Sequence, residues 1–399
     1  MKRFFLLTLA SAALLGASAA PVKTYEVKSP DGRLALVLTA GERLSFTVAR
    51  NGETLVAPSE MALTLSTGEV LGESPRVRSA RRRAVTETID APLYRQSRFD
   101  AAYNELDLRL RGDYGILARA YDDGVCYRFY TERDGELTIV DETAQLNFEG
   151  DPSAYIPYSK TEIPMRTSFE NTYEYAPLSK FRTQTVAFMP VLVDLGERGY
   201  VLYTESDVEA YPGVYLTYDK EAKGFAARFA EYPTETSLTK RFQDVVERSA
   251  DYIARVDGRR SYPWRIVAYA ATATELPVND MVWQTAEASR VADASWVRDG
   301  KIAWDWWNNW GVYGVDFKSG INTETYKYFI DFAAANGIEY VALDEGWGVR
   351  DGDVMHVVPE IDLPEIVSYA REKKVGIILW VVAKVLDDKL EEACRYYSE

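Results

Sequence analysis

Two kinds of hydrophobic periodicity follow one another along the chain. From about residue 22 to residue 274, short runs alternate apolar and polar positions between turn residues, a pattern typical of antiparallel strands. Asn51-Gly52 lies between two such runs and favours the type I′ turn of a hairpin. Further hairpins are predicted around residues 122–124 and 196–199, where glycine again separates two apolar runs. About 250 residues of this pattern predict a large β-sandwich over residues 21–275.

After a polar, partly helical connector at residues 276–300, strands alternate with helices. Apolar runs predict strands at residues 302–304, 338–343 and 375–382, and the unbroken hydrophobicity of the last predicts burial on both faces. Helices are predicted between and after them, from an Asn322 cap to Gly337, from the capping box Asp362-Leu-Pro-Glu365 onward, and over residues 386–397. Three successive βα units predict a parallel sheet with right-handed crossovers.

Three βα units do not make a closed structure. A (β/α)8 barrel needs eight units, and an open doubly wound sheet usually has about five or six. We therefore expect residues 301–399 to be the first three βα units of an incomplete (β/α)8 TIM barrel, in a chain that is a fragment of a longer protein. The alternative is a natural three-stranded domain packed on the sandwich.

The first twenty residues have the pattern of a cleavable secretory signal. Lys2-Arg3 precedes an apolar stretch over residues 4–15, and the small residues Ala17-Ser-Ala-Ala20 close it. No later segment approaches the ~18 uncharged apolar residues of a membrane span. We expect a soluble protein that is secreted or periplasmic and not inserted in a membrane.

Charge and composition restrict the possible chemistry. A net charge of −15 argues against nucleic acid or an anionic membrane as a partner. The single histidine, His356, argues against His-based triads and multi-His metal sites. The two cysteines, Cys126 and Cys394, provide neither a disulfide framework nor zinc-ligand spacing. Any catalysis must therefore use carboxylates.

Acids and tryptophans follow the first two predicted parallel strands, as Trp304-Asp-Trp-Trp-Asn308 and Leu343-Asp-Glu-Gly-Trp347. The carboxyl ends of barrel strands face the active site, and adjacent strands lie about 4.8 Å apart, so the two clusters should meet in one pocket. Carboxylates accept hydrogen bonds from sugar hydroxyls and indole rings cover the apolar sugar face, although any one tryptophan can equally be a core residue. The predicted substrate-binding residues are Asp305, Trp306, Trp307, Asn308, Asp344, Glu345 and Trp347.

The stretch from Ser295 through these clusters to Trp380 resembles glycoside hydrolase family 97, and its retaining α-galactosidase branch more than its inverting α-glucosidase branch. Residues 29–32, 168–179 and 204–213 also fit this family. The resemblance implies a β-super-sandwich, a catalytic (β/α)8 barrel, a small C-terminal β domain and a calcium ion (Ca2+) that bridges domains. It implies Glu170 as a calcium ligand, with Glu174 a weaker candidate, and carboxylate oxygen suits this ion.

The resemblance also places the catalytic residues outside this chain. Retaining enzymes need two carboxyl groups about 5 to 5.5 Å apart. The nucleophilic aspartate would end the fourth barrel strand and the acid/base glutamate would come later, both beyond Glu399. Asp344 and Glu345 are then expected to hold substrate hydroxyls. Glu345 would be a base only in an inverting site, where the two carboxyl groups stand about 6.5 to 9.5 Å apart.

The sequence therefore predicts the N-terminal half of a secreted, calcium-dependent, retaining α-galactosidase that acts on α-linked oligosaccharides. The fragment itself is expected to be inactive, because neither catalytic carboxyl group lies in it. The alternatives are an α-glucosidase of the same family and, in another functional class, a non-catalytic glycan-binding protein.

Overall fold

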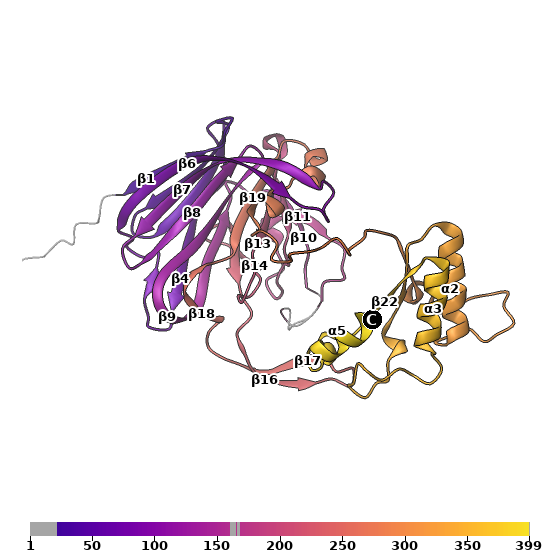
Figure 1. Ribbon diagram of the computed structural model, residues 1–399. Coiled ribbons are helices and arrows are strands. Elements are labelled where there is room, and N and C mark those ends of the chain that lie inside the picture. Colours follow the sequence, from indigo (N-terminus) through magenta and orange to yellow (C-terminus); the bar gives the residue numbers. More distant parts are fainter. Residues whose placement is uncertain (1–21, 160–164, 166–167, 399) are drawn as a thin grey trace, which may run out of the picture. The chain divides into compact units, whose positions relative to one another are not determined.

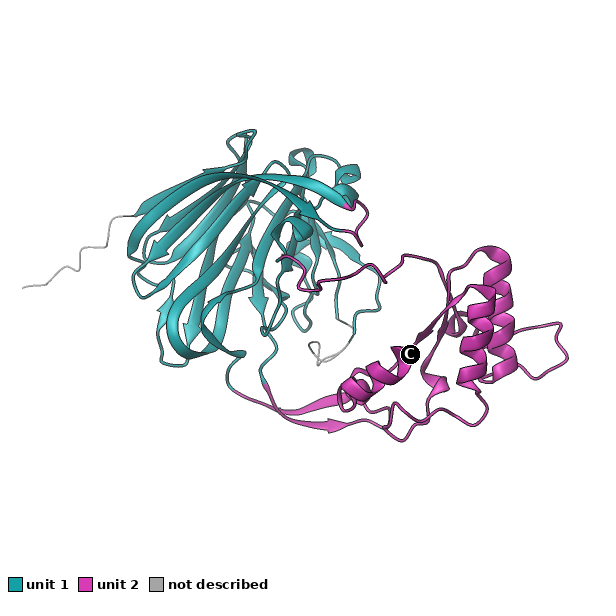
Figure 2. Cartoon of the chain, viewed as in Figure 1, with its two compact units in different colours: residues 1–91, 98–232, 251–287 teal, residues 92–97, 233–250, 288–399 magenta. Residues whose placement is uncertain are grey.

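The computed structural model describes residues 22–159, 165 and 168–398, so the predicted secretory signal lies outside the described residues. The chain divides into two compact units (Figure 2). Unit 1 comprises residues 1–91, 98–232 and 251–287, and unit 2 comprises residues 92–97, 233–250 and 288–399. No helix of the described residues is long and apolar enough to cross a membrane.

Unit 1 is built from antiparallel strands (Figure 1). The 24-residue strand β9 connects them, because β4, β8, β15, β18 and β19 all pair with it. The helix α1 (Met281–Thr285) follows the last of these strands. The strands are β1 (Lys23–Lys28), β2 (Leu34–Ala40), β3 (Leu44–Arg50), β4 (Glu53–Leu65), β5 (Val70–Leu71), β6 (Val77–Asp90), β7 (Arg98–Leu110), β8 (Tyr114–Tyr121), β9 (Gly124–Asn147), β10 (Ser153–Ile156), β11 (Glu174–Pro177), β12 (Val191–Asp194), β13 (Tyr200–Ser206), β14 (Tyr215–Asp219), β15 (Gly224–Arg228), β18 (Ala254–Ser261) and β19 (Trp264–Ala270).

Alternating burial along these strands agrees with the sequence pattern. In β2, for example, Leu34, Leu36 and Leu38 are buried and the residues between them are half-buried. The predicted hairpin turn is present at Asn51 and Gly52, where φ is 51° and 85° as a type I′ turn requires. Mostly antiparallel sheet around a large apolar core, with a smaller buried cluster beside it, is consistent with the predicted sandwich.

Unit 2 contains a parallel three-stranded sheet in the order β20-β21-β22. The strands are β20 (Ile302–Trp304), β21 (Tyr340–Leu343) and β22 (Gly376–Leu379), and the helices are α2 (Thr323–Asn336), α3 (Leu363–Lys373), α4 (Ala383–Asp387) and α5 (Leu390–Ser398). Two 3-10 turns, η5 (Asp305–Asn308) and η6 (Glu345–Trp347), follow the first two strands. The predicted parallel βα units are present, whereas the barrel that they would begin stays a prediction.

The caps of α2 and α3 follow the sequence prediction. The side chain of Asn322 accepts a hydrogen bond from the backbone N–H of Thr325, and Gly337 ends α2 with φ at 63°. Asp362 likewise accepts from the N–H of Glu365 at the start of α3. Local hydrogen-bonding chemistry therefore sets both ends of α2 and the start of α3.

Two predictions in unit 2 were wrong. β22 is not buried on both faces, because it is the edge strand of the described sheet and Ile378 keeps 37% of its surface exposed. The helix predicted over residues 386–397 is two helices, since α4 ends at Asp387 and α5 begins at Leu390. The spacing of apolar residues continues through this break, which explains why the sequence pattern indicated one helix.

Unit 2 also contains a hairpin from the middle of the sandwich sequence. Its strands are β16 (Pro233–Leu238) and β17 (Asp244–Ser249). The sequence pattern assigned these residues to the first domain, 21–275, because their alternation is that of an ordinary strand pair. Their contacts instead group residues 233–250 with residues 288–399.

Candidate sugar-binding site

The two strand-end clusters meet at the carboxyl edge of the parallel sheet. β20 and β21 are neighbours, and η5 and η6 begin directly after them. The backbone N–H of Asp344 donates to Oδ2 of Asp305 at 3.2 Å. The indole N–H of Trp304 donates to Oδ2 of Asp344 at 2.8 Å. The sequence therefore identified side chains that lie together in space.

Asp305 is an interior acceptor and does not reach the surface. Its exposed fraction is 0%. Besides the Asp344 N–H, its Oδ2 accepts from the Tyr326 hydroxyl at 2.7 Å and from the Trp310 indole N–H at 2.9 Å. Burial raises the pKa of Asp305, against the opposing effect of these hydrogen bonds. Its Oδ1 has no hydrogen-bond partner in the described part of the chain. This geometry gives Asp305 a supporting role beneath the site and no direct contact with a ligand.

Two exposed tryptophans stand on two half-buried ones. Trp306 packs edge-on against Trp310, with ring centroids 5.3 Å apart, and Trp307 packs edge-on against Trp304 at 5.4 Å. The exposed fractions are 53% for Trp306 and 81% for Trp307. The inner rings, Trp310 and Trp304, are the same two whose N–H groups are held by Asp305 and Asp344.

The loop after η5 adopts an uncommon backbone conformation. Asn309 and Trp310 have φ at 51° and 53°, in the left-handed region that an aromatic residue seldom occupies. The backbone N–H of Trp310 donates to the Asp305 carbonyl at 3.0 Å, and the Asn308 amide donates to the Gly311 carbonyl at 2.8 Å. Backbone strain of this kind persists where the surroundings fix it, and functional sites are a common place for it.

Asp344 and Glu345 are half-buried at the end of β21. Asp344 caps η6 by accepting the N–H of Glu345 at 2.6 Å. The Glu345 carboxylate accepts from both Nε and Nη2 of Arg241, the former at 3.1 Å, and Arg350 lies 3.4 Å from it. Arg241 lies at the tip of the β16–β17 hairpin, 104 residues earlier in the sequence. No motif in the sequence indicated Arg241, because only the fold brings it to Glu345.

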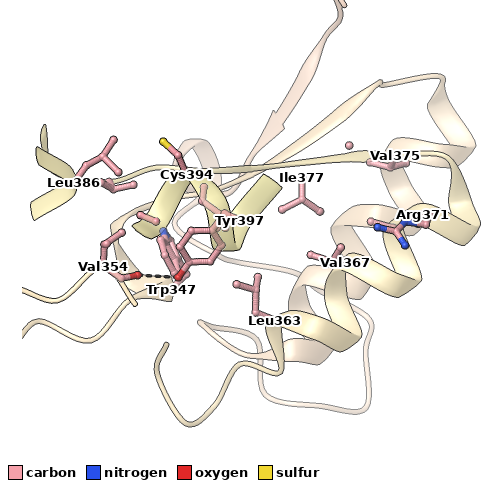
Figure 3. Close-up of a pocket in the computed structure, with 15 residues that line it drawn as sticks. Trp347, Val354, Leu363, Val367, Arg371, Val375, Ile377, Leu386, Cys394 and Tyr397 are labelled. Carbon is pink, nitrogen blue, oxygen red and sulfur yellow. Dashed lines mark hydrogen bonds between the residues drawn. The ribbon is translucent and has the colours of Figure 1, made fainter. Parts of the chain in front are cut away.

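Trp347 is a core residue. Only 2% of its surface is exposed, its indole N–H donates to the Trp380 carbonyl at 2.7 Å, and its ring packs edge-on against Tyr397. It lines an apolar cavity of about 530 Å³ formed by residues of α3, β22 and α5 (Figure 3). Most of the described residues that line this cavity are apolar, and Arg371 is the one charged residue among them, so the cavity is poorly suited to binding sugar hydroxyls.

The described residues contain no cluster of three or more acidic, histidine or cysteine side chains of the kind that holds a metal ion. Glu174 is bonded to Arg182 at 2.5 Å, and Glu170 is exposed in the segment before β11. Calcium takes about six to eight oxygen ligands, more than these two carboxylates provide.

Comparison with known proteins identifies the family. The sequence profile "Glycosyl-hydrolase 97 N-terminal" matches residues 27–287, and "Glycoside hydrolase 97" matches residues 306–399. The chain is 42% identical, over 94% of its length, to a "Retaining alpha-galactosidase" of Bacteroides thetaiotaomicron, of which it covers 58%. It is 30% identical, over 90% of its length, to a "Probable retaining alpha-galactosidase" of Streptomyces bingchenggensis, of which it covers 52%.

Solved structures share the fold. A glycoside hydrolase family 97 enzyme from Pseudoalteromonas sp. strain K8, in complex with acarbose, has a TM-score of 0.78 at 18% identity over 94% of this chain and 57% of its own. The E480Q variant of a family 97 enzyme from the same strain, in complex with panose, gives the same TM-score, identity and coverage. The chain thus spans a little over half the length of its curated relatives. On the two profile matches and the 42% identity, the chain belongs to glycoside hydrolase family 97.

Proposed function

We propose that the full-length protein is a glycoside hydrolase that removes terminal α-galactosides from oligosaccharides with retention of configuration. The observation that carries this proposal is the 42% identity to a retaining α-galactosidase, which extends over 94% of the chain and includes both units. The likeness to the Pseudoalteromonas enzymes, at 18% identity, concerns the fold alone and does not favour their ligands for this protein.

Within this proposal the strand-end clusters hold the sugar. Trp306 and Trp307 are exposed and provide ring surface on which the C–H groups of a pyranose would pack. Asp344 and Glu345, at η6, keep acceptor positions for hydroxyl groups. Asn308 lies in η5, the same turn as Trp306 and Trp307. Asp305 and Trp347 are buried, so in this proposal they support the exposed residues of the two clusters from beneath.

We place the reacting carboxyl groups outside this chain. A retaining pair stands about 5 to 5.5 Å apart, with one group as nucleophile and the other as acid/base. Asp344 and Glu345 are engaged with Trp304 and Arg241 respectively, which suits residues that orient substrate. The chain alone is therefore expected to bind sugar weakly and to hydrolyse nothing.

Calcium dependence and export are part of the same proposal. Glu170 would provide a calcium ligand, and Glu174 is the weaker choice because Arg182 already neutralises it. The other ligands would come from elsewhere in the full-length protein. The secretory signal at residues 1–20 would direct the protein out of the cytoplasm, to the periplasm or the medium.

The test is hydrolysis of p-nitrophenyl α-galactoside and α-glucoside by the full-length protein, with and without a calcium chelator. We expect α-galactoside hydrolysis that the chelator abolishes and that calcium restores, with α-galactose as the first product in an NMR time course. Preference for the glucoside with a β-anomer first would indicate the inverting α-glucosidase. Binding of galactosides without hydrolysis of either substrate would indicate a non-catalytic glycan-binding protein.

A further inference from the structure

The β16–β17 hairpin has no core of its own. In the part of the chain that the structure describes, its two strands pair only with each other. All residues of β16 and four of the six residues of β17 are exposed. An isolated two-stranded hairpin is marginally stable in water. Contacts at its two ends therefore matter for its order: at the base the Tyr232 and Tyr252 rings pack 5.3 Å apart, and at the tip it contacts the rest of unit 2.

The tip is a tight loop fixed by Thr239. The Thr239 N–H donates to the Gln243 carbonyl at 2.9 Å, and its Oγ1 accepts from the N–H groups of Arg241 and Gln243, each at 3.1 Å. Phe242 takes φ at 57°, in the left-handed region. Arg241 and Phe242 lie side by side in this loop, and both side chains reach the rest of unit 2.

Both side chains of the tip contact the loop that follows β21. Arg241 holds the Glu345 carboxylate through two nitrogen atoms. The Phe242 ring lies over Gly352, where an added Cβ would stand 3.0 Å from the ring. Gly352 also has φ at 83°, so a larger residue there would be strained as well as crowded.

We propose that Arg241 is a positioning residue of the sugar site. The planar guanidinium group of Arg241 binds both carboxylate oxygens of Glu345. This fixes the orientation of the carboxylate, and with it the direction in which its remaining lone pairs can accept a hydrogen bond from a sugar hydroxyl. Lysine at this position would keep the charge but lose the two-nitrogen geometry. This inference rests on the proposed role of Glu345 and extends the site to a hairpin encoded within the sandwich sequence.

The anchoring contact is tested on this chain by hydrogen–deuterium exchange of residues 233–250. We expect Arg241→Ala to accelerate exchange of the hairpin amides about tenfold, because it removes the ion pair that holds the hairpin tip to Glu345. Glu345→Gln should have a similar effect, and the double variant should add little to either one. The matched control is Arg248→Ala, which removes an exposed ion pair with Glu235 on the same hairpin and should leave exchange unchanged.

The positioning role is tested by kinetics of the full-length protein on p-nitrophenyl α-galactoside. Arg241→Ala should lower kcat/KM about tenfold, chiefly through KM, with Arg241→Lys intermediate and Arg248→Ala unchanged. Unchanged exchange in Arg241→Ala would overturn the proposal, and so would faster exchange with unchanged kcat/KM. If the wild-type protein hydrolyses nothing, the proposed function fails, while the exchange experiment still decides whether Arg241 anchors the hairpin at Glu345.

Discussion

The Trp304 indole N–H donates to Asp344 Oδ2 at 2.8 Å, and the ring of Trp304 in turn supports the exposed Trp307. Asp305, Trp310 and Trp306 repeat this order of acid, inner indole and outer indole. Each acid therefore fixes the orientation of an inner indole, and an exposed outer indole packs against that inner ring. An exposed ring held in this way loses little conformational freedom when a sugar packs on it.

Replacing Asp305 should test its role as an interior acceptor. Asp305→Ala would leave three donors, from Trp310, Tyr326 and the Asp344 backbone, without an acceptor, so we expect unit 2 to lose about 3 kcal/mol of unfolding free energy. Asp305→Asn keeps one acceptor oxygen and should lose much less. Urea unfolding followed by tryptophan fluorescence reports mainly on unit 2, which holds seven of the nine tryptophans.

The difference in unfolding free energy between wild type and Asp305→Asn should depend on pH, and the sign of that dependence follows from the pKa of Asp305. Burial raises the pKa of Asp305, so its contribution to stability is fully present below the pKa of an unfolded aspartate and is lost as pH rises through the folded value. The stability advantage of wild type over Asp305→Asn should therefore shrink with rising pH. Equal unfolding curves for Asp305→Ala and wild type would contradict the interior-acceptor role.

His356 should titrate above its ordinary range. A hydrogen bond from Nδ1 to Asp351 at 2.7 Å, with the nearby charge of Asp353, raises the pKa of His356 above 6.5. The stability that this ion pair provides is present below the unfolded pKa and is lost as pH rises through the folded one. Because the chain has one histidine, a single NMR ring resonance reports the titration.

Asp351→Asn should lower that midpoint toward the ordinary histidine value, whereas Asp316→Asn, as a control in the same unit, should leave it in place. A wild-type midpoint below 6.5 would show that the His356–Asp351 contact does not form in solution.

The two cysteines should react differently in the folded chain. Both are free, with Cys126 buried and Cys394 exposed. Burial also raises the pKa of the Cys126 thiol to about 12, which disfavours the reactive thiolate. Ellman's reagent should therefore titrate one thiol in the native chain and two after denaturation, and Cys394→Ser should abolish the native reaction. Two reactive native thiols would contradict the burial of Cys126.

Local chemistry made much of unit 2 predictable from the sequence. The caps at Asn322, Gly337 and Asp362 depend on a few neighbouring residues, and so do the strands before each acidic cluster. The positions of Asp305 and Asp344 followed from the rule that the carboxyl ends of parallel strands lie at the same edge of the sheet.

The roles of the site residues depended on distant packing and could not be read from the sequence. Asp305 is buried because Tyr326 of α2 reaches it, and Trp347 is buried because Tyr397 and Trp380 enclose it. Arg241 belongs to a hairpin whose pattern is that of an ordinary strand pair. Only the fold shows that it contacts Glu345.

The central claim, that the strand-end tryptophans bind the sugar, is tested most directly by Trp307→Ala in the full-length protein. Trp307 is 81% exposed, so its removal should leave the fold intact. Burial of about 60 Å² of ring surface by a sugar would be worth about 1.5 kcal/mol, which predicts a roughly tenfold loss of kcat/KM for p-nitrophenyl α-galactoside. Trp296→Ala, at an exposed tryptophan outside both clusters, should change nothing. Equal kcat/KM values for wild type and Trp307→Ala would contradict the account.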